Sequence, residues 1–243
     1  MTPWVLLHGW GFHAAIWKDL VDDADRARET RLIDLPGHGA AAAHPLTTLD
    51  ALADDIAASM PAGALVVGWS FGGLVAQRLA HRHPGRVRAL ALIASTPCFV
   101  SRAGWAHGVP AATLETFAAE LRADASATLA RFVNLNAVGG DNGRDAARAA
   151  MRRLQEQPAP SQDALDSGLE LLRTTDLRDE VAGLSHPTVV IHGTRDRIVP
   201  VEAGRWLARA LPQARLVELP AAAHMPFVSH RPAVLGALEA FDA

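Results

Sequence analysis

The sequence predicts an α/β fold, in which a mainly parallel β-sheet is flanked by helices and interrupted by an all-helical insertion. Short apolar runs alternate with longer amphipathic segments, as expected when strands are covered on both faces by crossover helices. This alternation stops in one central stretch that contains no strand candidate. The chain has 243 residues, of which 49% are hydrophobic and 20% charged, so it can bury a sizeable core.

The candidate strands are short apolar runs, apolar on both faces and bounded by turn residues. They lie at residues 4–7, 31–34, 64–68, 87–94, 188–192 and 214–219. The candidate helices between and after them lie at residues 49–59, 74–82, 201–211 and 232–241. Strands that alternate with helices in this way indicate a parallel sheet.

The central stretch breaks the alternation. Four helix-like segments follow one another there, separated by the breakers "GGDNG" and "PAPS". They lie at residues 111–123, 125–136, 144–157 and 162–174. An all-helical insertion in an α/β sheet usually lies over the carboxyl ends of the strands, where ligands bind. We therefore predict one core domain made of residues 1–97 and 182–243, with a four-helix lid at residues 98–181.

Charge and cysteine content narrow the functional classes. The formal net charge of −3 gives no reason to expect nucleic-acid or general membrane binding. Cys98 is the sole cysteine, which excludes an internal disulfide and fits a reducing compartment. The start of the chain lacks the pattern of a signal peptide, and no apolar run has the length of a membrane span. We expect a cytoplasmic monomer.

The segment "ALVVGWSFGGLVAQRLA" carries the clearest chemical motif. Gly68-Trp69-Ser70-Phe71-Gly72 reads G-x-S-x-G between a predicted strand and a predicted helix, which is the context of a nucleophile elbow. Such a sharp turn leaves room only for small residues two positions before and after the serine, whose hydroxyl then projects at the helix N-terminus. Ser70 is the predicted nucleophile; an ordinary glycine-rich turn is the alternative.

A serine nucleophile needs a base, and the base needs an orienting carboxylate. Asp196 follows a predicted strand in "TVVIHGTRDRIVP", and His224 follows the last predicted strand in "LVELPAAAHMPF". Alone, Asp196 could be a turn or salt-bridge residue, and His224 is one of eleven histidines. Their order along the chain, and their places after strands, favour Asp196 as the acid and His224 as the base.

The loop "GWGFHA" at residues 9–14 has two interpretations. It fits G-x-G-x-x-A, and Asp34 closes the next apolar run, where a dinucleotide-binding fold places its ribose-binding acid. That interpretation leaves the serine, the later aspartate and the histidine unused. As part of a hydrolytic site, the loop instead supplies an oxyanion hole with the backbone N–H groups of Trp10 and Phe71. Asp34 then braces the turn "DLPGHG".

These motifs resemble those of the α/β-hydrolases, and within them the biotin-pathway carboxylesterases that cleave the methyl ester of pimeloyl-[acyl-carrier protein]. The specific part of the resemblance lies in "LLHGWGFHAAIW", "GWSFGGLVAQ", "RFVNLNAVG" and "AAAHMPFVSH". It implies a serine esterase whose partner is an acyl-carrier protein bearing a methyl pimeloyl group. No cysteine or histidine spacing fits zinc, and no cofactor is expected. The substrate contacts that the resemblance implies are Trp10, Ser70, Phe71, Phe132, Val133, Asn134, Leu135, Asn136 and His224.

Four arginines of the predicted lid are candidate carrier contacts. Arg144, Arg148 and Arg152 are spaced i, i+4 and i+8 and so share one helix face, and Arg131 precedes the channel segment. Arginine forks suit the phosphate and carboxylates of an acidic carrier. A solvated helix face is the alternative. The positions of the lid arginines in the resembled family tip the choice toward carrier binding.

Two other functional classes stay open. One is another hydrolase or lyase on the same fold, such as a general short-chain carboxylesterase or a menaquinone-pathway relative. The other is a non-catalytic ligand receptor that retains the fold. A serine at the elbow argues against dehalogenases and epoxide hydrolases, which place an aspartate there.

Overall fold

The computed structural model describes residues 1–242, which are built around one six-stranded sheet with the strand order β2-β1-β3-β4-β5-β6. Every neighbouring pair of strands is parallel. The strands are β1 (Trp4–Leu7), β2 (Thr30–Ile33), β3 (Ala64–Trp69), β4 (Val87–Ile93), β5 (Thr188–Gly193) and β6 (Ala214–Leu219). The predicted α/β fold with a parallel sheet is confirmed.

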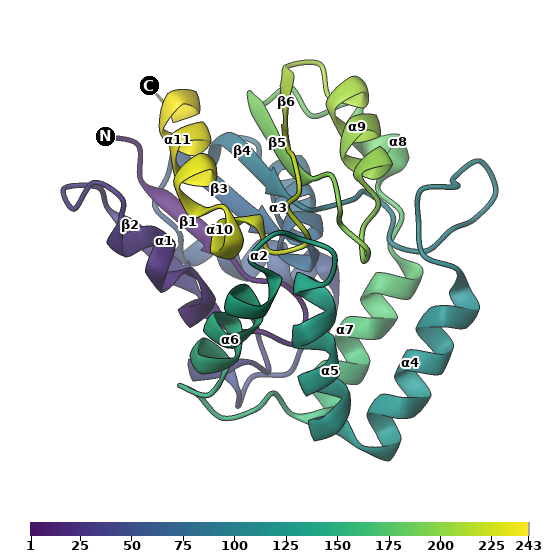
Figure 1. Cartoon of the computed structure of the whole chain (residues 1–243). Helices are drawn as coiled ribbons and strands as arrows, with labels where there is room; N and C mark the ends of the chain where they lie inside the picture. The colour runs from purple at the N-terminus through teal and green to yellow at the C-terminus, as the bar shows by residue number, and fades with distance from the viewer. Residues whose placement is uncertain (243) are drawn as a thin grey trace.

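Helices cover both faces of this sheet (Figure 1). Because side chains alternate along a strand, Val5 and Leu7 of β1 pack in the hydrophobic cluster that contains α2, α3 and α9. Trp4 and Leu6 pack in a second cluster on the other face, with α1 and α11. These elements, together with the short helices of the core, are η1 (Ala14–Trp17), α1 (Lys18–Asp22), η2 (Gly39–Ala41), α2 (Leu49–Ser59), α3 (Phe71–Arg82), α8 (Arg178–Val181), α9 (Val201–Ala210), α10 (Pro226–Ser229) and α11 (Arg231–Asp242).

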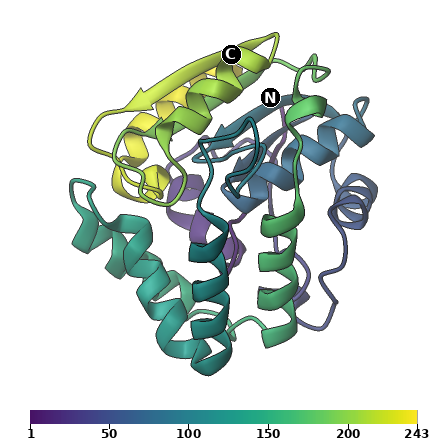
Figure 2. The ribbon, with the colours of Figure 1, turned by 90° about the vertical axis from the view of Figure 1, so that its right-hand side faces the viewer.

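Four longer helices form an insertion between β4 and β5. They are α4 (Ala111–Ala123), α5 (Ala125–Ala137), α6 (Gly143–Leu154) and α7 (Gln162–Thr174). In Figures 1 and 2 they lie together at one end of the sheet. Helix α5 packs against both α4 and α6, and α4 packs against α7. Asp124 caps α5 and Ser161 caps α7, which fixes where these helices begin.

The C-terminal end of α6 is tied to the core beside the first loop of the chain. Arg153 pairs with Asp19, and Lys18 pairs with Glu156 just beyond α6. The Nε2 atom of His13 lies 3.1 Å from the carbonyl oxygen of the last residue of α6. The insertion is therefore fastened at this point. The assignment of residues 98–181 as a lid stays a prediction.

No helix within residues 1–242 has both the length and the apolar character that a membrane span requires.

Candidate active site

Ser70 lies on the sharp turn between β3 and α3. Its φ of 53° and ψ of −115° place it in a backbone region that L-residues rarely adopt. A Cβ atom on Gly68 would lie 2.5 Å from the carbonyl oxygen of Gly72, and one on Gly72 would lie 2.3 Å from that of Leu7. These contacts explain physically why glycine stands on both sides of the serine.

Ser70, His224 and Asp196 lie in one line of hydrogen bonds. His224 Nε2 is 2.9 Å from Ser70 Oγ, and His224 Nδ1 is 2.7 Å from Asp196 Oδ2. A carboxylate only accepts, so Nδ1 carries the ring hydrogen and Nε2 is free to accept the serine proton. The side chains of His224 and Asp196 are 1% and 0% exposed. This geometry can activate a serine for attack on a carbonyl.

The carboxylate of Asp196 is held in its ionised form. Burial alone would raise its pKa, but the charge of His224 and the N–H groups of His192 and His224 outweigh burial, so the pKa of Asp196 is held well below its ordinary range. Its Oδ1 also accepts the backbone N–H groups of Ile198 and Val199, at 2.8 and 2.9 Å. Asp196 therefore supplies a fixed negative charge behind His224.

The main chain of His224 is held from two directions. Its N–H donates to the carbonyl oxygen of Asn136 in α5, at 3.0 Å. Its carbonyl oxygen accepts the indole N–H of Trp69, the residue before Ser70, at 2.8 Å. The insertion and the elbow thus both position this histidine.

Two buried backbone donors belong to residues at the Ser70 cavity: Phe71 directly follows Ser70 in the chain, and Trp10 lines the same cavity as Ser70. Within residues 1–242, the N–H groups of Trp10 and Phe71 donate to no protein acceptor, and both residues are buried. Phe71 is the first residue of α3, so its N–H lies at the positive end of the helix. The indole of Trp10 is fixed by a 3.0 Å hydrogen bond to the carbonyl oxygen of Leu165. Unpaired, preorganised donors of this kind stabilise an oxyanion.

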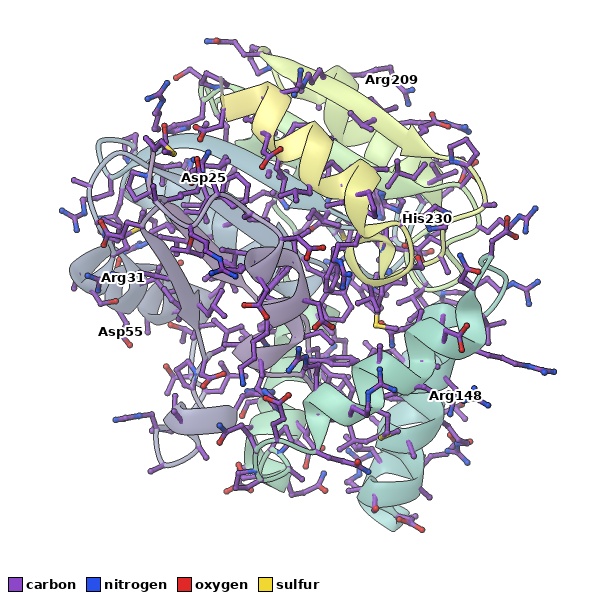
Figure 3. All side chains as sticks on the ribbon, turned by 60° about the vertical axis from the view of Figure 1, so that its left-hand side comes forward. Asp25, Arg31, Asp55, Arg148, Arg209 and His230 are labelled. Atoms are coloured by element: carbon purple, nitrogen blue, oxygen red, sulfur yellow. The ribbon has the colours of Figure 1, made fainter. Side chains whose placement is uncertain are left out.

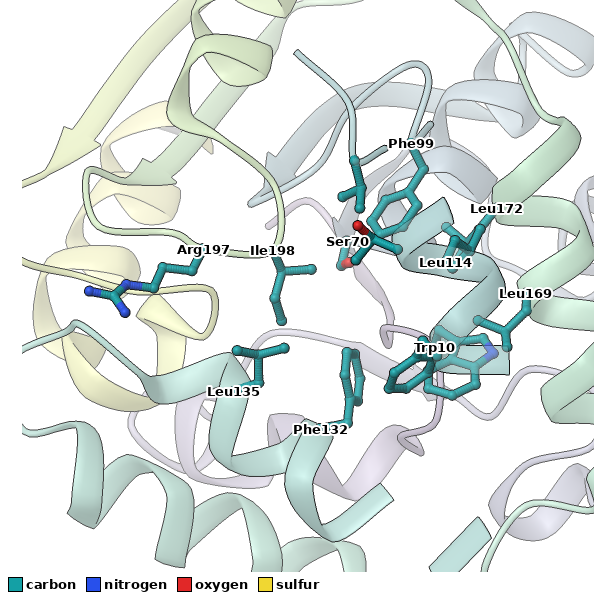
Figure 4. A pocket seen from close by; sticks show the side chains of 13 residues that line it. Trp10, Ser70, Phe99, Leu114, Phe132, Leu135, Leu169, Leu172, Arg197 and Ile198 are labelled. Carbon is teal, nitrogen blue, oxygen red and sulfur yellow. The ribbon is translucent and has the colours of Figure 1, made fainter. Parts of the chain in front are cut away.

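A mainly apolar cavity of about 120 Å³ opens at Ser70 (Figure 4). In this view Leu114, Leu169 and Leu172 of α4 and α7 lie to one side of the serine. Arg197 lies to the other side and is the charged residue of the lining. The wall suits a methylene chain.

The predicted channel segment divides between two environments. Phe132 and Leu135 line the cavity, whereas Val133 and Asn136 are buried and Asn134 is exposed, and these three stand outside the lining. The cause is the helical period, which turns successive residues of α5 to different faces. Five consecutive helical residues therefore cannot all face one channel.

Sequence reasoning missed most of the cavity wall. Leu169 and Leu172 are three residues apart on α7 and share a face. The same spacing also fits a helix that merely packs on the core, so it does not identify a ligand wall. Arg197 had a usable signal, because it directly follows the predicted acid.

The candidate carrier-binding arginines lie on α5 and α6, and all four are exposed. Arg131 pairs with Glu120 at 2.7 Å, and Arg148 lies 3.6 Å from Asp145. Arg144 and Arg152 make no ion pair with any residue of the described chain. Figure 3 shows Arg148 on α6, far across the molecule from Arg209 on α9. The full set is Arg131, Arg144, Arg148 and Arg152.

The chain is similar to known proteins over nearly its whole length. A family model described as alpha/beta hydrolase fold matches residues 2–231. The chain is 42% identical over 226 residues to the pimeloyl-[acyl-carrier protein] methyl ester esterase of Nitrosomonas europaea, covering 93% of this chain and 89% of that protein. It is 39% identical over 239 residues to the protein of the same name from Aeromonas hydrophila, covering 98% and 94%.

Solved structures of other proteins share the fold of this chain over nearly its whole length. An esterase from Exiguobacterium antarcticum matches with a TM-score of 0.88 at 21% identity, over 99% of this chain and 91% of that chain. The enol-lactonase from Burkholderia xenovorans matches with a TM-score of 0.84 at 27% identity, again over 99% and 91%.

Proposed function

The chain belongs to the α/β-hydrolase family, and we propose that it is a serine carboxylesterase that hydrolyses the methyl ester of pimeloyl-[acyl-carrier protein] in biotin synthesis. The observation that carries the reaction type is the hydrogen-bonded line from Ser70 through His224 to Asp196. The substrate follows from relatives that are 42% and 39% identical over most of their length and carry this activity in their names.

The first half-reaction forms an acyl-enzyme. His224 Nε2 takes the proton of Ser70, and Oγ attacks the carbonyl carbon of the methyl ester. The N–H groups of Trp10 and Phe71 stabilise the oxyanion. As the bond to the methoxy oxygen breaks, His224 returns its proton to that oxygen and methanol leaves. The pimeloyl group then remains as an ester on Ser70.

The second half-reaction releases the product. His224 takes a proton from water, the resulting oxygen attacks the acyl-enzyme carbonyl, and the same donors stabilise the second oxyanion. Ser70 leaves with the proton from His224. The product is a free carboxylate at one end of the acyl chain, while the thioester to the carrier at the other end is unchanged. Throughout both steps Asp196 stabilises the protonated form of His224.

We propose that the carrier docks on the insertion. Exposed arginines on α5 and α6 support this proposal, because their guanidinium groups fit the phosphate and carboxylates of an acidic carrier. One chain supplies the whole serine, histidine and aspartate line, which fits a monomer. We place the enzyme in the cytoplasm, since its single cysteine calls for no oxidising compartment.

The decisive experiment is mass spectrometry of methyl-pimeloyl carrier protein incubated with the enzyme, beside the Ser70→Ala variant. We expect the mass change from methyl ester to acid, with the thioester intact, and only with the wild type. An unchanged carrier, while the wild type hydrolyses a short activated ester, would support a general carboxylesterase instead. Activity that survives Ser70→Ala would overturn the proposed nucleophile.

A further inference from the structure

His192 is a second histidine beside Asp196, and the mechanism above gives it no role. It lies in β5 and is completely buried. Its Nε2 atom is 2.9 Å from the carbonyl oxygen of Val199 and 3.4 Å from Asp196 Oδ2. The second distance is long for a hydrogen bond. The Val199 carbonyl is therefore the main acceptor, and the carboxylate is a secondary one.

The surroundings of the ring determine where its hydrogen sits. Both neighbours of Nε2 are acceptors, so the hydrogen is on Nε2. The Nδ1 atom of His192 is buried and has no hydrogen-bond partner among the described residues. A second proton there would be an unpaired buried N–H, which is costly. His192 is therefore a neutral donor directed at the loop that carries Asp196.

The contacts of His192 close a ring through the catalytic loop. The N–H of Val199 donates to Asp196 Oδ1 at 2.9 Å, and the carbonyl of the same residue accepts from His192. The other carboxylate oxygen is next to both His224, at 2.7 Å, and His192, at 3.4 Å. These contacts connect His192 to His224 through the Asp196 carboxylate.

Helix α9 leaves room for the imidazole of His192. Gly204 lies on the buried face of α9, and a Cβ atom there would be 2.5 Å from His192 Nδ1. Glycine in a helix interior costs about 1 kcal/mol relative to alanine. The close approach of His192 gives a physical reason for glycine at this position.

We propose that His192 is a positioning residue for the hydrolysis. It holds the Asp196 carboxylate against His224 and takes up part of its negative charge. The inference rests on the proposed function only through the reacting set of Ser70, His224 and Asp196. It does not depend on which ester is the natural substrate.

The test compares His192→Phe, which keeps an aromatic ring without an N–H, with His192→Gln, which keeps a side-chain donor. Hydrolysis of p-nitrophenyl acetate is the assay. His192→Phe should lower kcat about tenfold with KM unchanged, which is the upper size of effect expected for the loss of one ordinary hydrogen bond. His192→Gln should recover part of the loss. Equal kcat values for wild type and His192→Phe would overturn the proposal.

The pH profile separates positioning from a merely structural role. Without the N–H of His192, more of the carboxylate charge acts on His224 and favours its protonated form. The acidic limb of kcat/KM should therefore move to higher pH in His192→Phe. If kcat/KM of His192→Phe falls at every pH in proportion to the fall in Tm, and the acidic limb does not move, the inference is contradicted.

Two further variants keep the test decisive. In an Asp196→Ala background, His192→Phe should leave the residual rate unchanged, since its effect passes through that carboxylate. A further tenfold loss there would count against the proposal. Gly204→Ala should lower kcat, because its new methyl group would lie 2.5 Å from His192 Nδ1 and displace the imidazole; wild-type kcat would contradict this.

The assay also separates this inference from the proposed substrate. If the enzyme hydrolyses p-nitrophenyl acetate but not the carrier-linked ester, only the proposed substrate is contradicted. The comparison of the His192 variants still tests the inference. Turnover of the activated ester that survives Ser70→Ala would overturn both.

Discussion

The backbone N–H of His224 donates to the carbonyl oxygen of Asn136 at 3.0 Å. His224 follows the last strand of the sheet, whereas Asn136 belongs to α5 of the insertion. The carbonyl of the same histidine accepts the indole N–H of Trp69. The insertion thus takes part in positioning the proposed base and does more than cover the cavity.

Replacing Trp69 by phenylalanine tests whether these hydrogen bonds position the main chain of His224. The variant leaves the buried carbonyl of His224 without its donor, so the free energy of unfolding should fall by about 1–3 kcal/mol. The kcat for p-nitrophenyl acetate should fall more than KM changes, because the base is held less well. Urea unfolding and steady-state kinetics measure both. Trp206→Phe, on α9, is the matched control, and an equal loss of kcat in the two variants would contradict the prediction.

The glycine after the elbow should not tolerate even one added methyl group. The Cβ of Gly72→Ala would lie 2.3 Å from the carbonyl oxygen of Leu7, so we expect a loss of about 3 kcal/mol or more. In Gly236→Ala, on α11, the new methyl group meets no atom within 4 Å. That variant should gain up to about 1 kcal/mol from helix propensity. Chemical denaturation of both variants checks the opposite signs.

Two buried histidines should make the fold sensitive to mild acid. Burial, followed by the charge of His38, lowers the pKa of His8 well below 6.5, and burial lowers the pKa of His38. As pH falls below about 6.5, the unfolded chain therefore binds protons before the folded one. The stabilisation from keeping these two histidines neutral is fully present above that pH. Below it, the free energy of unfolding falls by at most about 1.4 kcal/mol per pH unit for each histidine.

Urea unfolding between pH 7.5 and 5 measures that slope. His38→Gln should make it shallower, because one group whose pKa is lower in the folded than in the unfolded state is removed. His81→Gln, at an exposed position of α3, is the control. The nearby charged groups His13 and Asp34 are the same in both variants. Equal slopes in the two variants would refute the assignment.

Reversing the charge at Arg148 should affect only the carrier-linked substrate. We expect Arg148→Glu to raise KM for methyl-pimeloyl carrier protein by about tenfold, mostly through slower association. Hydrolysis of p-nitrophenyl acetate should not change. Arg209→Glu makes the same change in net charge at the distant site labelled in Figure 3. The prediction fails if both substrates, or both variants, respond equally.

Most of the sheet could be predicted from the sequence because the inner strands β1, β3, β4 and β5 are mostly buried on both faces and therefore read as short apolar runs. The edge strands β2 and β6 are partly exposed. The bounds of β1, β6 and α2 agree with the prediction. Helix α3 begins at Phe71, earlier than the predicted residue 74, because the elbow turns directly into the helix. The sequence does not predict the short segments η1, α1, η2, α8 and α10. Helices of three to five residues are too short to show a helical period.

The sequence predicts the serine, aspartate and histidine of the site from their order along the chain, but it does not predict most residues of the cavity wall. Ser70, Asp196 and His224 each follow a strand, and parallel strands bring their carboxyl ends to one edge, where the three side chains meet. Their catalytic roles stay predictions until the variants above are assayed. The cavity wall comes from helices whose apolar faces look the same whether they contact ligand or core, so sequence alone does not separate the two.

Lys18 is the sole lysine of the chain, and its pairing with Glu156 joins the core to the end of α6. An amine-reactive reagent therefore has one side chain to modify, and that amine is held in the ion pair with Glu156 while α6 stays in place. If the insertion detaches, the modification of Lys18 will speed up, and peptide mass spectrometry can distinguish it from reaction at the N-terminal amine. The native protein thus contains its own reporter of insertion movement, which requires no engineered label.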